Sequence, residues 1–419
     1  MEAGLRDLTL LGTGLRVVLG VVAAAAVGAL VAWRRPGWRR RLLCRWLPGV
    51  AVVDVVLTWS FRRGTRITDH LPPSFHVWVG LVVLALLAGA RRRALATVVV
   101  AVLAAANAFV QVNGHYGYFP TVGTVLGRPP PEAVGAARLA AELRAWPTPP
   151  TPRPKHGQLV PLDIAPTASH LRHRAGSVWL PPAYFDARRA RLPVVLMLSG
   201  APGSAIAWSQ SGFATRTADA YAQAHDGVAP ILVFTDQNGS VVGDTECVDG
   251  PRGNAETFLT VDFAGFLHDR LHVHPPPDRT AVVGFSEGGT CALVLALRHP
   301  DLFGRLGDLA GDGAPNIGSP ARTLRTLFGG DQAAMDAHDP ALLLSTRRYP
   351  NLAAWVVTGR RDRRHLATGR AVAARLRAAG ARVSSSRVGG GHDWPFAGRA
   401  LRRVLPALAD HMLAPPSAA

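Results

Sequence analysis

Cysteine is scarce in this chain, with three residues among 419. Cys44, Cys247 and Cys291 show no spacing of the kind that binds zinc or an iron–sulfur cluster, so we expect no metal and no cofactor. Three cysteines also make no disulfide framework. We expect Cys291 to serve as a small apolar side chain on a buried helix, and Cys247 to be free or to pair with another chain.

Acidic residues are also few, since 28 Asp and Glu stand against 46 Lys and Arg, a net charge of +18. Residues 1–150 carry +11 of this excess and the remaining residues carry +7. The sequence has no zinc-finger spacing, heptad run or basic-aromatic RNA motif, so we expect no nucleic-acid partner. The excess after residue 150 fits attraction to anionic membrane lipids, at about 1 kcal/mol per basic residue near the surface. An arginine-rich codon usage explains it equally well.

Long apolar runs, in contrast, are abundant before residue 113. Four of them predict an all-α transmembrane domain of about four helices over residues 1–112. The outer two are long enough to span a bilayer of roughly 30 Å, and the middle two are at the short end. Tryptophans lie near their ends, as in an aromatic belt. The runs cover roughly residues 15–33, 46–61, 75–90 and 94–112, and the tryptophans are Trp33, Trp46, Trp59 and Trp78.

The arginines between these runs predict the orientation. Nine arginines occupy the first and third connections, whereas the second connection holds three together with Asp69. Because short loops rich in arginine stay cytoplasmic, the N-terminus and everything after residue 112 would lie outside. This predicts a multi-pass protein of the cell membrane with an extracytoplasmic domain, and we expect no cleavable secretory signal. The topology inverts if one of the middle runs does not span.

Asp54 lies inside the second apolar run, where an ionised carboxylate costs roughly 2.5–3.5 kcal/mol. It is therefore a functional candidate. We consider three roles for it: binding a lipid headgroup, pairing with an arginine, or remaining protonated between helices.

Residues 113–154 are predicted to connect this domain to the next one. The segment is rich in glycine and aromatic residues up to about residue 121, continues as an alanine-rich helix at about 131–146 and ends in a proline-rich, semi-rigid spacer. Residues 155–419 are enough for a single domain with its own core. Strands at about 159–164, 177–180, 192–198, 352–358 and 381–388, alternating with helices, predict a mostly parallel sheet in an α/β fold.

The run Gly284-Phe-Ser286-Glu-Gly288 follows a β-branched apolar strand and precedes an apolar helix. A G-x-S-x-G run in that context is the nucleophile elbow of the α/β-hydrolase fold. Small residues beside the serine let the strand and the helix approach each other. The serine then stands at the carboxyl edge of the sheet, beside a helix N-terminus that suits a developing oxyanion. Ser286 is therefore the predicted catalytic nucleophile.

Two partners for Ser286 appear in the chain order that this fold uses, acid and then histidine. Asp362 follows the end of a late buried strand, and His392 follows a further strand and three glycines. We expect His392 to deprotonate Ser286, and Asp362 to orient His392 and stabilise its charged form. An aspartate in that position is more often a helix cap than a catalytic acid. Asp393 ranks below Asp362 because adjacent side chains diverge.

The strand at 192–198 ends in a turn with the sequence Ser199-Gly-Ala-Pro-Gly203. We expect the oxyanion hole to consist of the backbone N–H groups of Ala201, in this turn, and of Glu287, which follows the nucleophile. The predicted substrate-binding residues are Trp208 and Trp394, as apolar lining. The segment 313–349 contains helical pieces at about 321–328 and 340–345 and is either a lid or a plain surface insertion.

These motifs resemble a known family. The runs at 284–293, at 299–303 and at 391–396 are similar to those of the esterase D-type "putative esterase" family, which includes the secreted actinobacterial mycolyltransferases. The turn after Leu198 and the position of Trp394 are similar to theirs as well. The resemblance covers about residues 155–415. It implies an α/β-hydrolase fold, a Ser-Asp/Glu-His triad, and ester hydrolysis or acyl transfer.

The prediction is a membrane-anchored, extracytoplasmic serine esterase or acyltransferase. Its substrates would be acyl esters of the envelope, namely acylated lipids, aminoacylated phospholipids or acylated glycans, and its expected partners are lipid-linked substrate and membrane lipids. Tethering would favour substrates at the outer leaflet by raising their local concentration. One alternative is a catalytically inactive receptor or scaffold with the same fold. Another is a serine peptidase, which is less favoured because no propeller-like repeat precedes the domain.

Overall fold

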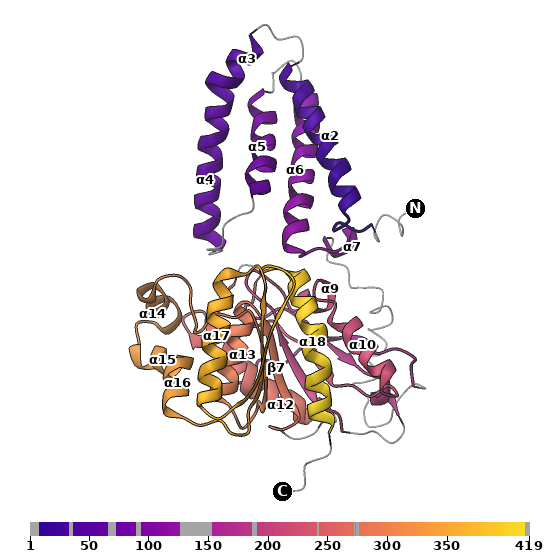
Figure 1. Ribbon diagram of the computed structural model, residues 1–419, viewed down its shortest axis with the longest axis vertical. Helices are drawn as coiled ribbons and strands as arrows, with labels where there is room; N and C mark the ends of the chain where they lie inside the picture. The colour runs from indigo at the N-terminus through magenta and orange to yellow at the C-terminus, as the bar shows by residue number, and fades with distance from the viewer. Residues whose placement is uncertain are drawn as a thin grey trace. The chain divides into compact units, whose positions relative to one another are not determined.

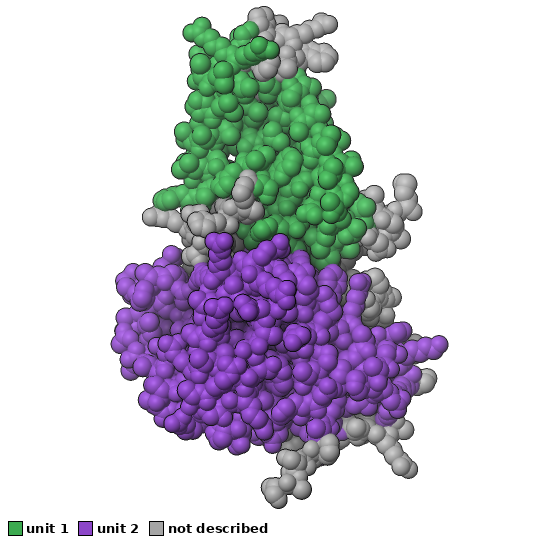
Figure 2. Space-filling model, viewed as in Figure 1, with its two compact units in different colours: residues 1–128 green, residues 129–419 purple. Residues whose placement is uncertain are grey.

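The structure is a computed structural model that describes residues 8–32, 37–65, 73–88, 94–125, 153–186, 191–240, 243–271, 273 and 276–414. The chain divides into two compact units, Met1–Arg128 and Pro129–Ala419 (Figure 2). The predicted connector falls partly in unit 1, where α7 (Val122–Val125) follows the last long helix. The alanine-rich helix expected at about 131–146 and most of the proline-rich spacer lie outside the described residues.

Unit 1 is helical, and each of the four predicted apolar runs lies on a helix. Three helical stretches are long and apolar enough to cross a membrane: Thr13–Val31, Arg39–Ser60 and Ala94–Tyr116. The second is longer than the sequence predicts because α3 (Trp38–Arg41) and the π-helical turn η1 (Leu42–Trp46) continue into α4. The helices are α2 (Thr13–Ala32), α4 (Leu47–Thr65), α5 (Pro73–Ala88) and α6 (Ala94–Tyr116). With 16 residues, α5 is the shortest of these four.

The outer faces of these helices are apolar. Val18, Val55 and Val99 are each more than half exposed, while a small inner cluster that includes Ala85 and Ala104 is buried. Many large exposed apolar side chains are unusual on proteins that are surrounded by water. Their exposure on unit 1 is in keeping with helices that could cross a membrane.

Asp54 has a partner in unit 1 that the sequence analysis does not consider. Its carboxylate oxygens lie 3.1 and 2.9 Å from Nδ1 of His76, which is in the first turn of α5. The pairing with an arginine is therefore not the one observed. Two residues 22 positions apart on neighbouring helices form a contact that no local sequence pattern indicates.

Unit 2 contains an eight-stranded sheet with the order β1-β2-β4-β3-β7-β8-β9-β10 (Figure 1). The pairs β1–β2 and β2–β4 are antiparallel, and all pairs from β4 to β10 are parallel. The strands are β1 (Gln158–Leu162), β2 (Gly176–Leu180), β3 (Val194–Leu198), β4 (Ile231–Phe234), β7 (Thr280–Phe285), β8 (Arg305–Leu309), β9 (Ala353–Gly359) and β10 (Arg382–Val388). A separate small ribbon pairs β5 (Asp249–Gly250) with β6 (Gly253–Asn254).

Helices cover both faces of this sheet. Figure 1 shows α13 and α17 on one side of the strands and α10 and α18 on the other. The main helices are α10 (Ala214–Ala224), α12 (Phe263–Arg270), α13 (Glu287–Arg298), α17 (Arg363–Ala378) and α18 (Trp394–Leu413), and the segment 313–349 forms α14 (Pro320–Phe328), α15 (Gln332–Ala337) and α16 (Pro340–Thr346). Short helical turns are η4 (Pro182–Phe185), α9 (Ala207–Gln210), α11 (Ala255–Thr257) and η5 (Phe258–Asp262).

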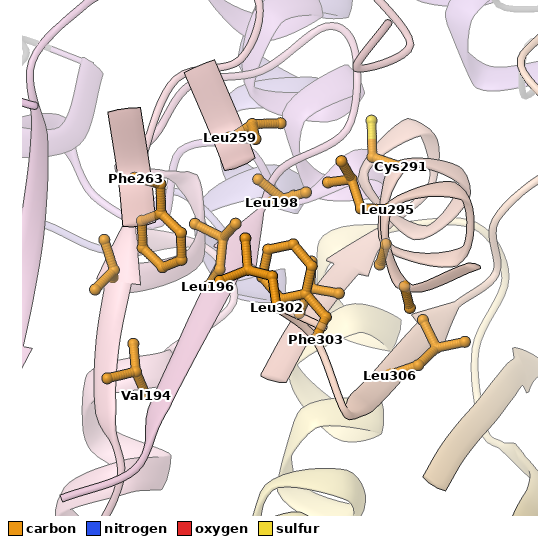
Figure 3. Packing of buried hydrophobic residues seen from close by; sticks show 14 of the residues in the cluster. Val194, Leu196, Leu198, Leu259, Phe263, Cys291, Leu295, Leu302, Phe303 and Leu306 are labelled. Atoms are coloured by element: carbon orange, nitrogen blue, oxygen red, sulfur yellow. The ribbon is translucent and has the colours of Figure 1, made fainter. Parts of the chain in front are cut away.

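The core of unit 2 lies between the sheet and its helices. Leu196 and Leu198 of β3 point toward Phe263, Leu295 and Phe303 from three other segments (Figure 3). Every residue of β3 and of β7 is buried, as expected of parallel strands that are covered on both faces. The predicted α/β-hydrolase fold with a mostly parallel sheet is confirmed.

Candidate active site

The candidate nucleophile lies on a sharp turn between β7 and α13. Ser286 has φ 59° and ψ −123°, a left-handed backbone conformation that is strained for a residue with a side chain. A Cβ atom on Gly284 would lie 1.8 Å from the carbonyl oxygen of Gly288, and one on Gly288 would lie 2.3 Å from that of Leu198. Glycine is therefore required at both positions, because the helix starts directly against the strands. This is the geometry of a nucleophile elbow.

The structure brings the three predicted catalytic residues together. Oγ of Ser286 lies 2.8 Å from Nε2 of His392, and Nδ1 of His392 lies 2.9 Å from Oδ2 of Asp362. In the tautomer that satisfies both contacts, Nδ1–H donates to Asp362 and Nε2 accepts the hydroxyl hydrogen of Ser286. The three side chains come from the ends of β7, β9 and β10, which meet at the carboxyl edge of the sheet.

The loop that carries His392 is held by a hydrogen bond and by an aromatic contact. Nε of Arg399 donates to the carbonyl oxygen of Gly389, and the ring of Phe285 lies 5.0 Å from that of His392. Asp393, the lower-ranked acid, caps α18 by accepting from the backbone N–H of Phe396 at 2.7 Å. Asp393 is therefore committed to the helix and Asp362 to the histidine.

Asp362 fills both of the roles that the sequence analysis weighs. It caps α17 by accepting from the backbone N–H of His365 at 3.2 Å, and it contacts His392. Burial alone would raise the pKa of Asp362, but hydrogen bonds from His365 and His392 hold that pKa well below its usual range. The carboxylate is therefore ionised at neutral pH. The contact between Asp362 and His365 is not among the sequence-based predictions, although a histidine three residues into a helix lies on the same face as the cap.

The predicted oxyanion-hole residues flank the nucleophile. A Cβ atom on Gly200 would lie 2.9 Å from Cβ of Ser286, so the turn that contains Ala201 lies directly against the serine. Nε2 of Gln237 donates to the carbonyl oxygen of Ser199 at 2.7 Å and anchors this turn. Glu287 is the first residue of α13, where backbone N–H groups have no partner within the helix. The oxyanion role of Ala201 and Glu287 stays a prediction.

Trp208 and Trp394 do not form an exposed lining, and their assignment as substrate-binding residues is corrected. Their exposed fractions are 0% and 1%, and their rings pack edge to face with centroids 5.2 Å apart. Nε1 of Trp208 donates to the carbonyl oxygen of Leu198 at 2.8 Å. Both indoles are part of the core beneath the site, where they support the oxyanion turn and the histidine loop.

The expectation that Cys247 is free or pairs with another chain is also wrong. Cys247 and Cys291 form a disulfide bond within the chain, with their Cα atoms 5.4 Å apart. The bond ties the loop before β5 to α13, five residues after Ser286. Cys291 faces the core as expected, but it does so as half of a cross-link. Cys44, in unit 1, is exposed and not bonded.

The cross-linked loop places a second carboxyl group beside Glu287. Glu246 has a left-handed backbone, is buried, and lies close enough to Glu287 for the two charges to interact. Burial raises the pKa of both side chains well above the ordinary value of glutamate, and nearby carboxylates, with Asp244 foremost, raise them further. Oε2 of Glu287 accepts a hydrogen bond from Nδ2 of Asn238 at 2.7 Å. Negative charge on these two side chains is therefore disfavoured next to the nucleophile.

Two groups of side chains among the described residues have the spacing of metal ligands. One is Cys247, Glu287 and Cys291, and the other is Asp362, His365 and His392. The sulfur atoms of the first group are joined in the disulfide, so thiolate ligation is excluded there. In the second group both histidines already hydrogen-bond to Asp362 at 2.8–2.9 Å. The donor sets therefore fit the contacts just described without a metal.

The segment 313–349 forms three helices, and two of them coincide with the predicted helical pieces. Side chains cap all three, with Ser319, Asp331 and Asp339 at the N-termini. Leu327 and Phe328 pack against Val248 of the cross-linked loop. The choice between a lid and a plain insertion stays a prediction.

The sequence profile of a family described as "Putative esterase" matches residues 168–407, which include the elbow, the acid and the histidine. The chain belongs to this esterase family. The chain is therefore a serine carboxylic-ester hydrolase, as the resemblance of its motifs implies.

Two further comparisons place the esterase among known proteins. An uncharacterized protein of Corynebacterium glutamicum is 31% identical over 350 residues, or 80% of this chain and 79% of that protein. Unit 2 is shorter than this alignment, so the similarity extends into unit 1. Among solved structures, a ferulic acid esterase superposes with a TM-score of 0.53 at 19% identity, covering 61% of this chain and 99% of that one.

An S-formylglutathione hydrolase from Agrobacterium tumefaciens superposes with a TM-score of 0.51 at 18% identity, covering 62% of this chain and 97% of that one. At these identities the two structures show the shared fold alone. Both are covered almost completely, whereas more than a third of this chain has no counterpart in either of them.

Proposed function

We propose that this esterase is a membrane-anchored, extracytoplasmic serine hydrolase or acyltransferase that acts on acyl esters of envelope lipids or glycans. The observation that carries the proposal is the hydrogen-bonded series from Ser286 through His392 to Asp362, with contacts of 2.8 and 2.9 Å. Those are the distances at which a nucleophile and its base exchange a proton.

In the proposed reaction, Oγ of Ser286 attacks the ester carbonyl carbon while its proton moves to Nε2 of His392. The resulting oxyanion accepts hydrogen bonds from the backbone N–H groups of Ala201 and Glu287, each worth about 2.7–4 kcal/mol. When the carbonyl re-forms, the acyl–oxygen bond breaks and the leaving alkoxide takes the proton from His392. Water, or a second hydroxyl group, repeats the sequence in reverse and releases Ser286. Asp362 remains ionised and stabilises the imidazolium ion in both steps.

Two observations support the extracytoplasmic location, and a further one supports the membrane anchor alone. Three helices of unit 1 have the length and composition of membrane spans, which supports the anchor but not the side of the membrane on which unit 2 lies. The arginine distribution favours the outside for the residues after 112 when all four apolar runs span. The disulfide between Cys247 and Cys291 belongs to an oxidising compartment, because thiols in the bacterial or eukaryotic cytosol are kept reduced. The last of these is independent of any count of spans.

The membrane anchor supports a lipid-linked substrate. An enzyme tethered at a membrane meets substrates in the same surface at a raised effective concentration. The acyl group and the acceptor are not specified by the residues around Ser286, so water and an envelope hydroxyl group are both included in the proposal.

A fluorophosphonate probe that cannot cross membranes tests both parts of the proposal on intact cells. We expect it to label the wild-type protein and not Ser286→Ala. Labelling only after the cells are broken would keep the serine hydrolase and place unit 2 in the cytoplasm. No labelling before or after lysis would contradict the proposal and favour an inactive receptor or scaffold. Hydrolysis of amides in preference to esters would favour a peptidase.

A further inference from the structure

A second histidine lies behind the acid of the Ser286 site. Nδ1 of His365 is 2.8 and 2.9 Å from the two carboxylate oxygens of Asp362. The imidazole rings of His365 and His392 are stacked with centroids 4.2 Å apart and planes within 16° of parallel. Both rings therefore direct Nδ1 at the same carboxylate. His365 is 4% exposed, so it is not a surface that a substrate touches.

The far side of His365 meets a second carboxylate. Nε2 of His365 lies 3.4 Å from Oδ1 of Asp312, which follows β8. Asp312 is itself fixed, because Nη2 of Arg364 lies 3.1 Å from each of its oxygens and Nδ2 of Asn316 donates to it at 3.0 Å. Its backbone N–H donates to Oγ1 of Thr290 on α13 at 2.9 Å. The contacts form a continuous series of Asp312, His365, Asp362 and His392 that ends at the nucleophile.

The surroundings of His365 favour its charged form. Burial alone would lower the pKa of His365, but hydrogen bonds to Asp312 and Asp362 raise it to about 9. The charged and titratable groups that face it come from three parts of the chain: Asp308 and Asp312 at the end of β8, Asp362 and Arg364 at the start of α17, and His392 after β10. At neutral pH the series alternates in sign, with an imidazolium ion between two carboxylates.

We propose that His365 is a positioning residue that, together with Asp312, holds the Asp362 carboxylate in the orientation that His392 requires. This inference rests on the proposed function, since it assigns a role in the same proton transfer. The backbone N–H of His365 contacts only Oδ1 of Asp362, through the helix cap. Nδ1 of His365 lies within 2.9 Å of both carboxylate oxygens and so limits the rotation of the carboxylate that the cap and His392 alone would allow. The proton on His365 stays in place throughout the reaction, and only the proton between Ser286 and His392 moves.

Asp312 has a separate electrostatic part in this arrangement. A cation beside Asp362 would, by itself, weaken the stabilisation that Asp362 gives to the imidazolium ion formed on His392. The charge of Asp312 opposes that of His365, so Asp362 keeps its stabilising effect on His392. The two residues are therefore expected to act as a unit. Loss of either one disturbs the transition state, although neither contacts Ser286.

The test uses the full-length enzyme in detergent with a soluble chromogenic acyl ester, and compares wild type with His365→Gln, Asp312→Asn and the double variant. We expect kcat to fall about 10- to 100-fold with little change in KM, because misorientation of the base acts on the transition state. We expect the double variant to be no slower than the slower single variant. Labelling of each variant by a fluorophosphonate reports the fraction that is folded and competent.

The pH profile separates positioning from mere structural support. Wild-type kcat should decline on the alkaline side with a midpoint near 9, because neutral His365 has one N–H and can donate to only one of its two carboxylates. This decline should be absent in His365→Gln. In Asp312→Asn it should move to lower pH, because one of the two carboxylates that hold the proton on His365 is gone. His338 is a matched control, since it is also a buried histidine that is bonded to a carboxylate. Its Nε2 lies 2.8 Å from Oε2 of Glu256, and it has no contact with the series that ends at Ser286. His338→Gln should keep the wild-type decline.

Outcomes for this inference and for the proposed function can be told apart. An inactive, unlabelled wild-type enzyme would remove the proposed function and the inference with it. An active wild type whose kcat and alkaline decline are unchanged in His365→Gln would overturn the inference alone. If His365→Gln does not fold, Asp312→Asn decides the matter, and an unmoved alkaline decline in that variant would overturn the inference.

Discussion

The two units of this esterase use exposed apolar side chains in opposite ways. Among the described residues, all but two of the large apolar side chains that are exposed belong to unit 1, and the exceptions are Val261 and Leu342. Unit 2 places its apolar residues inside a sheet that is covered on both faces. The difference teaches how, in our proposal, the two units suit different solvents. Unit 2 excludes water from its core, whereas the exposed apolar side chains of unit 1 would face lipid.

The two units also differ in the surroundings of a similar pair of polar side chains. Each unit contains an aspartate bonded to a histidine at 2.9 Å, Asp54 with His76 in unit 1 and Asp362 with His392 in unit 2. The pair in unit 1 joins two neighbouring helices. The pair in unit 2 is part of a longer series that reaches Ser286 and, on the other side, His365. The same chemical pair thus joins two helices in one unit and, in our proposal, takes part in catalysis in the other.

The largest expected effect comes from matched substitutions in these two pairs. Asp362→Asn should lower kcat about 10⁴-fold, because an amide donates where the carboxylate accepts and favours the wrong tautomer of the histidine. Asparagine also caps helices well, so α17 should persist. Asp54→Asn should leave kcat at the wild-type value. Equal losses in the two variants, measured on purified full-length protein, would break the functional distinction between the pairs.

The disulfide gives the next largest effect. Cys291→Ala removes a cross-link between residues 44 positions apart, which should destabilise unit 2 by about 4 kcal/mol on chain-entropy grounds. Cys44→Ala is the matched control, because that residue is exposed and not bonded. Thermal unfolding of the two variants measures the difference. A wild-type melting temperature that is insensitive to reducing agent and to Cys291→Ala would mean that the bond is not formed in the cell.

The contrast in solvents predicts different effects of one substitution in the two units. Val99 and Val261 are 57% and 56% exposed. Val99→Asp should oppose membrane insertion of α6 by about 2.5–3.5 kcal/mol. Val261→Asp, on a surface that faces water, should change stability by less than about 0.5 kcal/mol. Extraction of each variant from membranes at alkaline pH measures the first effect, and thermal unfolding measures the second. Full membrane retention of Val99→Asp would contradict a lipid-facing unit 1.

The smallest effect concerns two buried glutamates of unit 2. Burial and neighbouring carboxylates raise the pKa of Glu246, so its contribution to stability is present below the unfolded value of 4.5 and is lost as the pH rises through the folded value. Glu246→Gln should therefore flatten the fall in stability above about pH 4.5. Burial alone would raise the pKa of Glu256, but hydrogen bonds from His299, His338 and Arg298 lower it, so its stabilisation is present above the unfolded value and lost in acid.

Glu256→Gln is consequently the control of opposite sign, and should destabilise the protein at neutral pH. Melting temperatures of wild type and both variants across the pH range measure the two slopes. Parallel slopes for the two variants would contradict the assignment of Glu246 as a carboxyl without a compensating cation.

Local patterns explain which parts of the fold could be predicted. The elbow, the strands at β3, β9 and β10 and the helical pieces of 313–349 all have a glycine, a cap or an apolar period within a few residues. Two strands lack such a signal. β4 is a four-residue apolar run that reads equally well as part of a helix, and β8 contains a buried arginine and a buried aspartate.

Contacts between distant residues explain what could not be predicted. The bond between Cys247 and Cys291 depends on a loop that returns to α13, and three cysteines alone do not indicate a pair. The burial of Trp208 and Trp394 depends on each other's position, because the two rings fill one space beneath the oxyanion turn. His365 is the exception. Its spacing of three from Asp362 is visible in the sequence, but its position between two carboxylates depends also on Asp312.

The central claim is that Ser286 is activated by His392, and mapping of a covalent adduct tests it most directly. The full-length protein is treated with a fluorophosphonate and digested, and the modified peptide is identified by mass spectrometry. We predict one adduct, on Ser286, formed rapidly in wild type and far more slowly in His392→Ala, while Ser384→Ala on the exposed edge strand β10 behaves as wild type. An adduct on another serine, or equal rates with and without His392, would contradict the account.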